Sequence, residues 1–219
     1  MTASLPQPCL CLVTDRTVTP SDLVERVTEA VAGGVDLVQL REKDLSNEGL
    51  LELAGTLLEA IGGRAKLIVN ERADVALAAG AQGVQLGESG PPVSEARKTL
   101  GGDALIGRSV HSLRSAAQAE ADGADFLVVG TMFASRSHPG ETPAGPSLMR
   151  GVSAKSRLPL IGIGGITPEN AAEVMNAGAS GVAVITNILA DKDPKAAAAK
   201  LKEAISEAWR VAEKPARVG

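Results

Sequence analysis

Aromatic side chains are scarce in this sequence: two Phe, one Trp and no Tyr occur among 219 residues. Base-stacking surfaces, aromatic cages and the aromatic belts of membrane proteins all need more rings than that. These classes of protein are therefore excluded. The core must instead be built from Ala, Val, Leu and Ile, within a hydrophobic fraction of 44% that is ordinary for a globular protein.

The sequence also lacks a net positive charge and long apolar runs. The formal net charge is −4, whereas a general nucleic-acid binder is normally basic. No apolar run reaches the length of about 18 residues that suggests a membrane span. Residues 1–8 lack the basic start and apolar stretch of a signal peptide. We therefore expect a cytoplasmic protein whose partners include neither nucleic acid nor a membrane.

Only two cysteines are present, Cys9 and Cys11, two residues apart in an expected strand. We expect their side chains to point to opposite faces of that strand, which argues against a disulfide between them. No second pair of cysteines exists to complete a zinc site.

Glycine is plentiful, with 24 residues, and it marks an internal repeat. Four times, a glycine is followed by a small residue and then by an apolar run. This pattern is typical of a helix that ends at a glycine in a left-handed conformation and passes at once into a buried strand. The marker glycines are Gly34, Gly80, Gly123 and Gly178.

Between these repeats lie four other β-rich runs, each followed by a turn and a helical stretch. They are residues 9–14, 66–70, 104–109 and 159–164. Eight strands alternating with helices in a chain of this length predict an α/β protein with a closed (β/α)8 TIM barrel. An open doubly wound sheet is the alternative. No linker divides residues 1–219, so we expect one domain, with a last helix over about 194–212 and a flexible tail over 213–219.

Polar residues follow the expected strands at the end of the barrel where active sites lie. Gln39, Arg41 and Lys43 alternate along one extended segment, so we expect them on one side, as an anion clamp. The alternative is an ordinary charged surface run. The loop 162–168 follows the seventh strand and, with residues 185–187, predicts a phosphate site. A tight turn that needs glycine only for steric reasons is the other interpretation.

The segment 131–145 is the longest without apolar patterning, and it predicts a binding loop or lid, or else a plain insertion. Both histidines, His111 and His138, fall near the expected rim. No paired-histidine spacing is present, so zinc is not expected, and a structural hydrogen bond is the simpler role for His111.

Five segments, taken in order, resemble a known family. They are LVTDR at 12–16, VQLREK at 38–43, LIVNERAD at 67–74, GVQLG at 83–87 and IGIGGITPEN at 161–170. Over nearly the whole chain they resemble the thiamine phosphate synthases and their close relatives, the TenI-type thiazole tautomerases. The set identifies this superfamily but separates its two activities poorly.

The resemblance implies a transferase that joins hydroxymethylpyrimidine diphosphate to a thiazole or carboxythiazole phosphate and releases diphosphate. A thiazole tautomerase, which is an isomerase, and a non-catalytic barrel that binds thiazole phosphate are the alternatives. The resemblance also implies catalytic roles for Ser109, Arg41 and Lys43, and a monomer or homodimer. The implied substrate-binding residues are Gln39, Arg41, Lys43, Asn70, Ser109, Ser135, Ser137, His138, Gly165, Ile185 and Thr186.

A leaving diphosphate needs cations and usually Mg²⁺ to neutralise its developing charge, so the resemblance implies a magnesium site. Here the sequence departs from the family pattern. The first magnesium Asp is replaced by Glu71, and the second aligns near Gly90, which has no side chain to offer. Gln85 replaces a His that is usual in the fourth strand of the family. Thr131 replaces a His that serves the tautomerases as acid and base.

Overall fold

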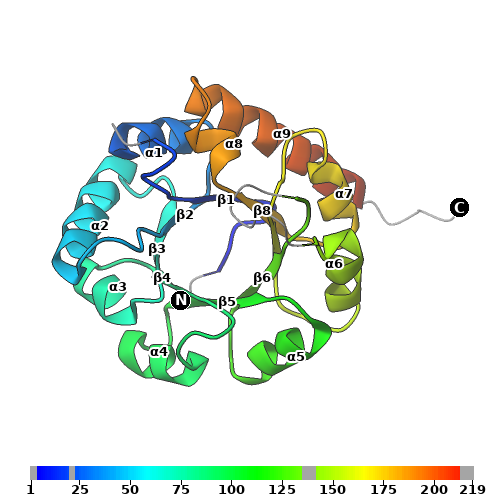
Figure 1. Cartoon of the computed structure of the whole chain (residues 1–219), viewed down its shortest axis with the longest axis horizontal. Coiled ribbons are helices and arrows are strands. Elements are labelled where there is room, and N and C mark those ends of the chain that lie inside the picture. Colours follow the sequence, from blue (N-terminus) through cyan, green and yellow to red (C-terminus); the bar gives the residue numbers. More distant parts are fainter. Residues whose placement is uncertain (1–3, 20–22, 135–141, 213–219) are drawn as a thin grey trace, which may run out of the picture.

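The eight apolar runs form strands that are all parallel and close into one barrel in sequence order, from β1 next to β2 round to β8 next to β1 (Figure 1). The computed structural model describes residues 4–19, 23–134 and 142–212. The predicted (β/α)8 fold is confirmed, and the open-sheet alternative is wrong. The strands are β1 (Cys9–Val13), β2 (Leu37–Leu40), β3 (Lys66–Asn70), β4 (Gly83–Leu86), β5 (Leu105–Val110), β6 (Phe126–Gly130), β7 (Leu160–Ile163) and β8 (Gly181–Val184).

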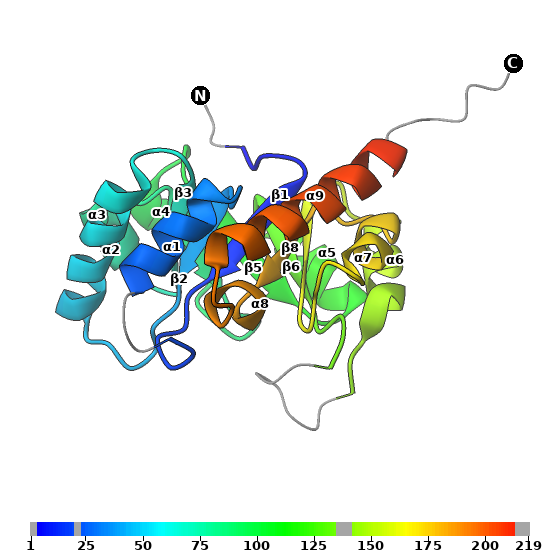
Figure 2. The same ribbon diagram turned by 90° about the horizontal axis from the view of Figure 1, so that it is seen from above.

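Helices surround the barrel (Figures 1 and 2), and their buried side chains form one hydrophobic cluster with side chains of the strands. The last of them, α9, has the bounds that the sequence predicts, and it packs across α1, α7 and α8. No described helix is long and apolar enough to cross a membrane. The helices are α1 (Leu23–Ala32), α2 (Asn47–Ile61), α3 (Ala73–Ala79), α4 (Val93–Leu100), α5 (Leu113–Ala121), α6 (Gly145–Ser153), α7 (Ala171–Asn176), α8 (Thr186–Leu189) and α9 (Pro194–Ala212).

The four-fold repeat has a structural counterpart at the end of the barrel where the strands begin. Each marker glycine has a positive φ. Two residues after it, a polar side chain accepts a hydrogen bond from a backbone N–H at the start of the preceding odd-numbered strand. Each repeat therefore ties together the two strands of one unit. The four contacts join Asp36 to Leu10, Gln82 to Leu67, Asp125 to Ile106 and Ser180 to Leu160, at 2.7, 2.7, 2.7 and 3.3 Å.

The inside of the barrel is filled by a separate cluster of buried side chains, which includes Phe126, Leu37 and Ile68. Cys9 and Cys11 both belong to it, because residues two apart on a strand share a face. Our expectation of opposite faces is therefore wrong. Both cysteines are free, as expected. Burial raises the pKa of the Cys11 thiol to about 12, and it raises the pKa of Cys9 as well.

Candidate active site

Four polar side chains from consecutive strands line the inside of the barrel at the ends of β2 to β5. Gln39 donates a hydrogen bond through Nε2 to Oδ1 of Asn70, at 3.0 Å. Gln85 donates through Nε2 to Oγ of Ser109, also at 3.0 Å. Gln39 and Gln85 are buried, while Asn70 and Ser109 are half-buried. We call these four residues the polar arc.

The opposite side of the barrel interior is aliphatic. Val128 on β6 belongs to the interior cluster, and Ile163 and Ile185 pack against it. The mouth therefore offers amide and hydroxyl groups on one side and hydrocarbon on the other. This arrangement suits a heterocycle that has one hydrogen-bonding edge, and it needs no aromatic ring for stacking.

Gln85 is a member of the polar arc that the sequence-based site did not include. Its side chain lies over Gly107 on the neighbouring strand β5. A Cβ built on Gly107 would be 2.1 Å from Oε1 of Gln85 and 2.2 Å from the ring of Phe126. Glycine at 107 thus makes the room in which Gln85 reaches Ser109. Two features of the sequence could have pointed to Gln85. One is an amide within an apolar strand, and the other is a glycine, Gly107, within the next strand along the chain.

The predicted anion clamp lies at the mouth, but its backbone is only partly extended. The strand β2 ends at Leu40, and Lys43 lies in a turn that is closed by a hydrogen bond from Leu45 N to Glu42 O. Alternation along one extended segment therefore does not carry through to Lys43. Lys43 nevertheless lies beside the polar arc, in a pocket of about 310 Å³. The pocket is lined by Leu40, Glu42, Lys43, Leu45, Leu50, Asn70, Glu71 and Arg72.

Glu71 has an unusual backbone conformation at the end of β3. Its φ of 59° lies in the left-handed region that a residue with a side chain seldom adopts. Its carboxylate reaches the loop after β4. A Cβ built on Gly90 would lie 3.4 Å from Oε1 of Glu71, so a side chain at position 90 would stand next to this carboxylate.

The acidic residue of the loop after β4, Glu88, already has hydrogen-bond partners. Its two oxygens bond the backbone N and the ring Nδ1 of His111, at 3.1 and 3.0 Å. Hydrogen bonds from Ser115 and His111 lower the pKa of Glu88, although its partial burial acts to raise it. His111 therefore has a hydrogen-bonding role in the structure, as expected.

Within the described ranges, no three or more His, Cys, Asp or Glu side chains come together to hold a metal ion. In proteins Mg²⁺ usually takes one or two carboxylates together with substrate phosphates and water. The carboxylate of Glu71, which lines the same pocket as Lys43, thus fits an ion that arrives with a diphosphate.

The glycine-rich loop after β7 packs against the segment that follows β6. Gly164 and Gly165 have φ values of 105° and 63°, which only glycine adopts readily. Phe133 N donates to Gly164 O at 2.9 Å, and a Cβ on Gly165 would be 2.4 Å from Ala134 O. The packing of this loop therefore requires glycine at both positions, and the predicted phosphate site here stays a prediction. Ile185 and Thr186 follow β8 and are half-buried nearby in the fold.

Three residues of the predicted site, Ser135, Ser137 and His138, lie outside the described part of the chain. The remaining members, from Gln39 to Thr186, all come from the carboxyl ends of strands or the loops that follow them. The barrel thus brings together at one end residues that the sequence separates widely.

Comparison with known proteins identifies the family. A family model described as thiamine monophosphate synthase matches residues 10–188. The thiamine-phosphate synthase of Moorella thermoacetica is 42% identical over 187 residues, which are 84% of this chain and 89% of that protein. A putative thiamine-phosphate synthase of Geobacter sulfurreducens is 45% identical over 192 residues, with coverages of 85% and 89%.

A solved structure agrees with the sequence relatives. Thiamine phosphate pyrophosphorylase from Pyrococcus furiosus superimposes with a TM-score of 0.83 and 34% sequence identity, over 91% of this chain and 96% of that one. The family model, the relatives and the fold therefore agree, and this chain belongs to the thiamine monophosphate synthase family.

Proposed function

We propose that this protein is a thiamine-phosphate synthase, a transferase that joins hydroxymethylpyrimidine diphosphate to thiazole or carboxythiazole phosphate. The observation that carries the proposal is the mouth of the barrel, where the polar arc lies beside Lys43 and Glu71. The names of the relatives favour this activity over that of an isomerase. We expect it to act in the cytoplasm as a monomer or homodimer.

In the proposed reaction, the bond between the pyrimidine methylene carbon and the diphosphate oxygen breaks, and its electron pair leaves with the diphosphate. The thiazole nitrogen then supplies the electron pair of the new bond to that carbon. With carboxythiazole phosphate, the carboxylate must also leave as CO2, and the electron pair of the broken carbon–carbon bond stays with the thiazole ring. The polar arc would hold the pyrimidine by its hydrogen-bonding edge. Arg41 and Lys43 would stabilise the charge that develops on the leaving diphosphate, because fixed cations act most strongly where charge appears in the transition state.

Ser109 would face the reacting centre. Gln85 Nε2 already donates to its oxygen, so the proton of the hydroxyl is free to be donated to a substrate atom. Gly165, Ile185 and Thr186, across the mouth, would bind the phosphate of the thiazole through backbone N–H groups and a hydroxyl. Two phosphorylated substrates would then be held from opposite sides of one mouth.

Magnesium belongs to the proposal as an ion held by the diphosphate together with Glu71. When bound, it would neutralise part of the negative charge of the leaving group. Gly90 cannot add a second carboxylate, so Glu71 would be its main protein ligand.

The direct test is to incubate the protein with both substrates and to measure thiamine phosphate and diphosphate, with and without a chelator. We expect formation of both products, and their loss when the chelator removes Mg²⁺. No diphosphate release under any condition would refute the proposal. Isomerisation of carboxythiazole phosphate without the pyrimidine substrate would instead establish the tautomerase.

A further inference from the structure

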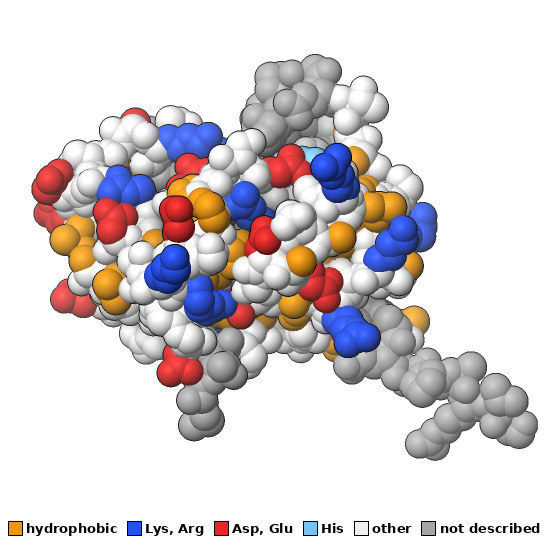
Figure 3. All heavy atoms as spheres, turned by 90° about the horizontal axis from the view of Figure 1, so that it is seen from below, with side chains coloured by type: hydrophobic (Ala, Val, Ile, Leu, Met, Phe, Trp, Pro, Cys, Tyr) orange, Lys and Arg blue, Asp and Glu red, His pale blue; other side chains and the backbone are white. Residues whose placement is uncertain are grey.

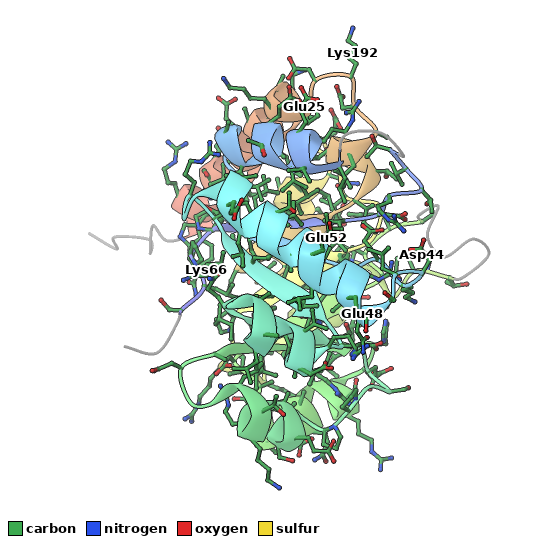
Figure 4. The ribbon with its side chains drawn as sticks, turned by 90° about the vertical axis from the view of Figure 1, so that its left-hand side faces the viewer. Glu25, Asp44, Glu48, Glu52, Lys66 and Lys192 are labelled. Carbon is green, nitrogen blue, oxygen red and sulfur yellow. The ribbon has the colours of Figure 1, made fainter. Side chains whose placement is uncertain are left out.

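The segment that carries the predicted anion clamp alternates in charge: Arg41, Glu42, Lys43 and Asp44 follow one another. It leaves β2 at the same end of the barrel as the start of α2. Figure 4 shows Asp44 and Glu48 at this end and Lys66, which begins β3, at the other. Two acidic residues inside an anion site would oppose anion binding unless other charges neutralise them.

Both acidic residues are paired with a single arginine from the neighbouring loop. Arg16, just after β1, donates its backbone N–H to Oε2 of Glu42 at 3.0 Å. Its guanidinium lies 2.5 Å from Oδ2 of Asp44 and 3.4 Å from Oε2 of Glu42. The Glu42 side chain is only 3% exposed. The carboxylate of Glu42 is thus a buried charge, and Arg16 is its cationic partner.

The backbone of the same segment is fixed by Thr14, which is fully buried. Thr14 N donates to Gln39 O at 2.9 Å, and its Oγ1 accepts a hydrogen bond from Arg41 N at 2.9 Å. The segment 14–16 therefore holds the segment 39–44 along its length. Thr14 bonds to Gln39 and Arg41, and Arg16 pairs with Glu42 and Asp44.

We propose that Glu42 and Arg16 are positioning residues for diphosphate binding, an inference that rests on the proposed function. The buried carboxylate anchors the turn from which Arg41 and Lys43 extend. Arg16 neutralises that carboxylate, so that it does not oppose the anion. The alternation in sequence thus separates two roles: Arg41 and Lys43 serve the anion, while Glu42 and Asp44 face Arg16.

The test uses inorganic pyrophosphate as the probe and calorimetric binding to the full chain. We expect Glu42→Gln to raise the Kd for pyrophosphate by about tenfold, because the turn loses its ionic anchor. Arg16→Ala should raise the Kd further, because it leaves Glu42 charged and unpaired. The double variant Arg16→Ala/Glu42→Gln should bind better than Arg16→Ala alone, a non-additivity that a general loss of packing does not produce.

Asp125→Asn is the matched control. Asp125 also accepts a backbone N–H, from Ile106 at 2.7 Å, and pairs with Arg97 at 2.6 Å, but at the opposite end of the barrel. It should lower the Tm and leave the Kd for pyrophosphate unchanged. If Arg16→Ala does not fold, the near-isosteric Glu42→Gln carries the test.

Kd values within twofold of the unmodified protein for Glu42→Gln and Arg16→Ala would overturn the inference, as would a failure of the unmodified protein to bind pyrophosphate. Failure of the proposed function is a separate result. The pyrophosphate affinity could depend on Arg16 and Glu42 as expected while the protein does not condense the two substrates. That result would refute the synthase activity alone.

Discussion

The side-chain nitrogen of Gln85 lies 3.0 Å from the hydroxyl oxygen of Ser109, so a buried amide on β4 sets the orientation of a hydroxyl on β5. The oxygen of the same amide, Oε1, is buried and has no hydrogen-bond partner among the described residues. The amide nitrogen therefore donates to Ser109 Oγ and to Leu86 O, the latter at 3.3 Å. The position of the Ser109 hydroxyl depends on this amide.

The first prediction concerns this pair. Ser109→Ala should lower kcat about tenfold or more, corresponding to the loss of a hydrogen bond of about 1.4 kcal/mol in the transition state. Gln85→Leu keeps the side-chain volume but frees the hydroxyl, so we expect a smaller loss in kcat. Steady-state kinetics with both substrates measures this. Equal activity of Ser109→Ala and the unmodified protein would exclude Ser109 from catalysis.

A second prediction concerns the glycine beneath Gln85. Gly107→Ala would place a Cβ where Gln85 and Phe126 already lie, so it should lower the free energy of unfolding by about 1–3 kcal/mol. Gly55→Ala is the control, because it lies within α2 with nothing within 4 Å of the added Cβ. That variant should gain about 0.5–1 kcal/mol. Denaturant unfolding compares the two; a stable Gly107→Ala protein would contradict the packing described.

The anion clamp leads to a third prediction. Arg41→Ala should weaken pyrophosphate binding by about 10- to 100-fold, because a hydrogen bond to a charged group contributes about 1.5–3 kcal/mol. Binding of thiazole phosphate should change little. Arg210→Ala, on the distant α9, serves as the control, since its Nε bonds only within its own helix, to Ser206 O at 3.2 Å. Equal losses for both ligands in Arg41→Ala would contradict the separate roles.

Magnesium dependence provides a fourth prediction. Glu71→Gln should raise the Mg²⁺ concentration needed for half-maximal activity by about tenfold, and Gly90→Asp should lower it by adding a carboxylate beside Glu71. Mn²⁺ binding in the presence of pyrophosphate, followed by electron paramagnetic resonance, gives a readout independent of turnover. Glu52→Gln, on the outer face of α2 (Figure 4), is the control. An unchanged metal requirement in both site variants would remove Glu71 from the magnesium site.

The two cysteines yield a fifth prediction. With its pKa raised to about 12, Cys11 stays a neutral thiol at pH 8, and Cys9 is shifted in the same direction. Neither should react with a thiol reagent until the protein unfolds. In the unfolded chain these thiols ionise near their ordinary pKa, so folding stability should fall as the pH rises above about 9. Labelling at pH 8 with and without denaturant tests this; rapid labelling of the folded protein would be inconsistent with their burial.

Much of the fold could be predicted from the sequence, because strands covered on both faces are written as continuous apolar runs. The bounds of β3 and α9 agree with the prediction, and each marker glycine has the expected positive φ. The resemblance to the family is confirmed as well. These features depend on neighbours in the chain, which a single sequence displays directly.

Less of the site could be predicted from the sequence, because its geometry depends on contacts between loops that follow different strands. Nothing next to Glu42 in the sequence shows that Arg16 neutralises it. The turn at Lys43 ends the alternation that the sequence suggested, and the left-handed Glu71 is directed at a loop after another strand. Figure 3 shows one side of the barrel, where acidic and basic side chains are interspersed, so charge does not gather in a single patch on that face.

The four polar side chains that follow the marker glycines each bond to a strand within their own β–α–β unit. None of these bonds crosses from one unit to the next. The barrel is therefore four modules joined by α2, α4 and α6 with their adjoining turns, and a circular permutation that opens the chain between modules, as at Gly101–Gly102, would keep all four internal bonds. The hydrogen bonds at the start of each pair of strands therefore do not depend on the order in which the modules follow one another along the chain.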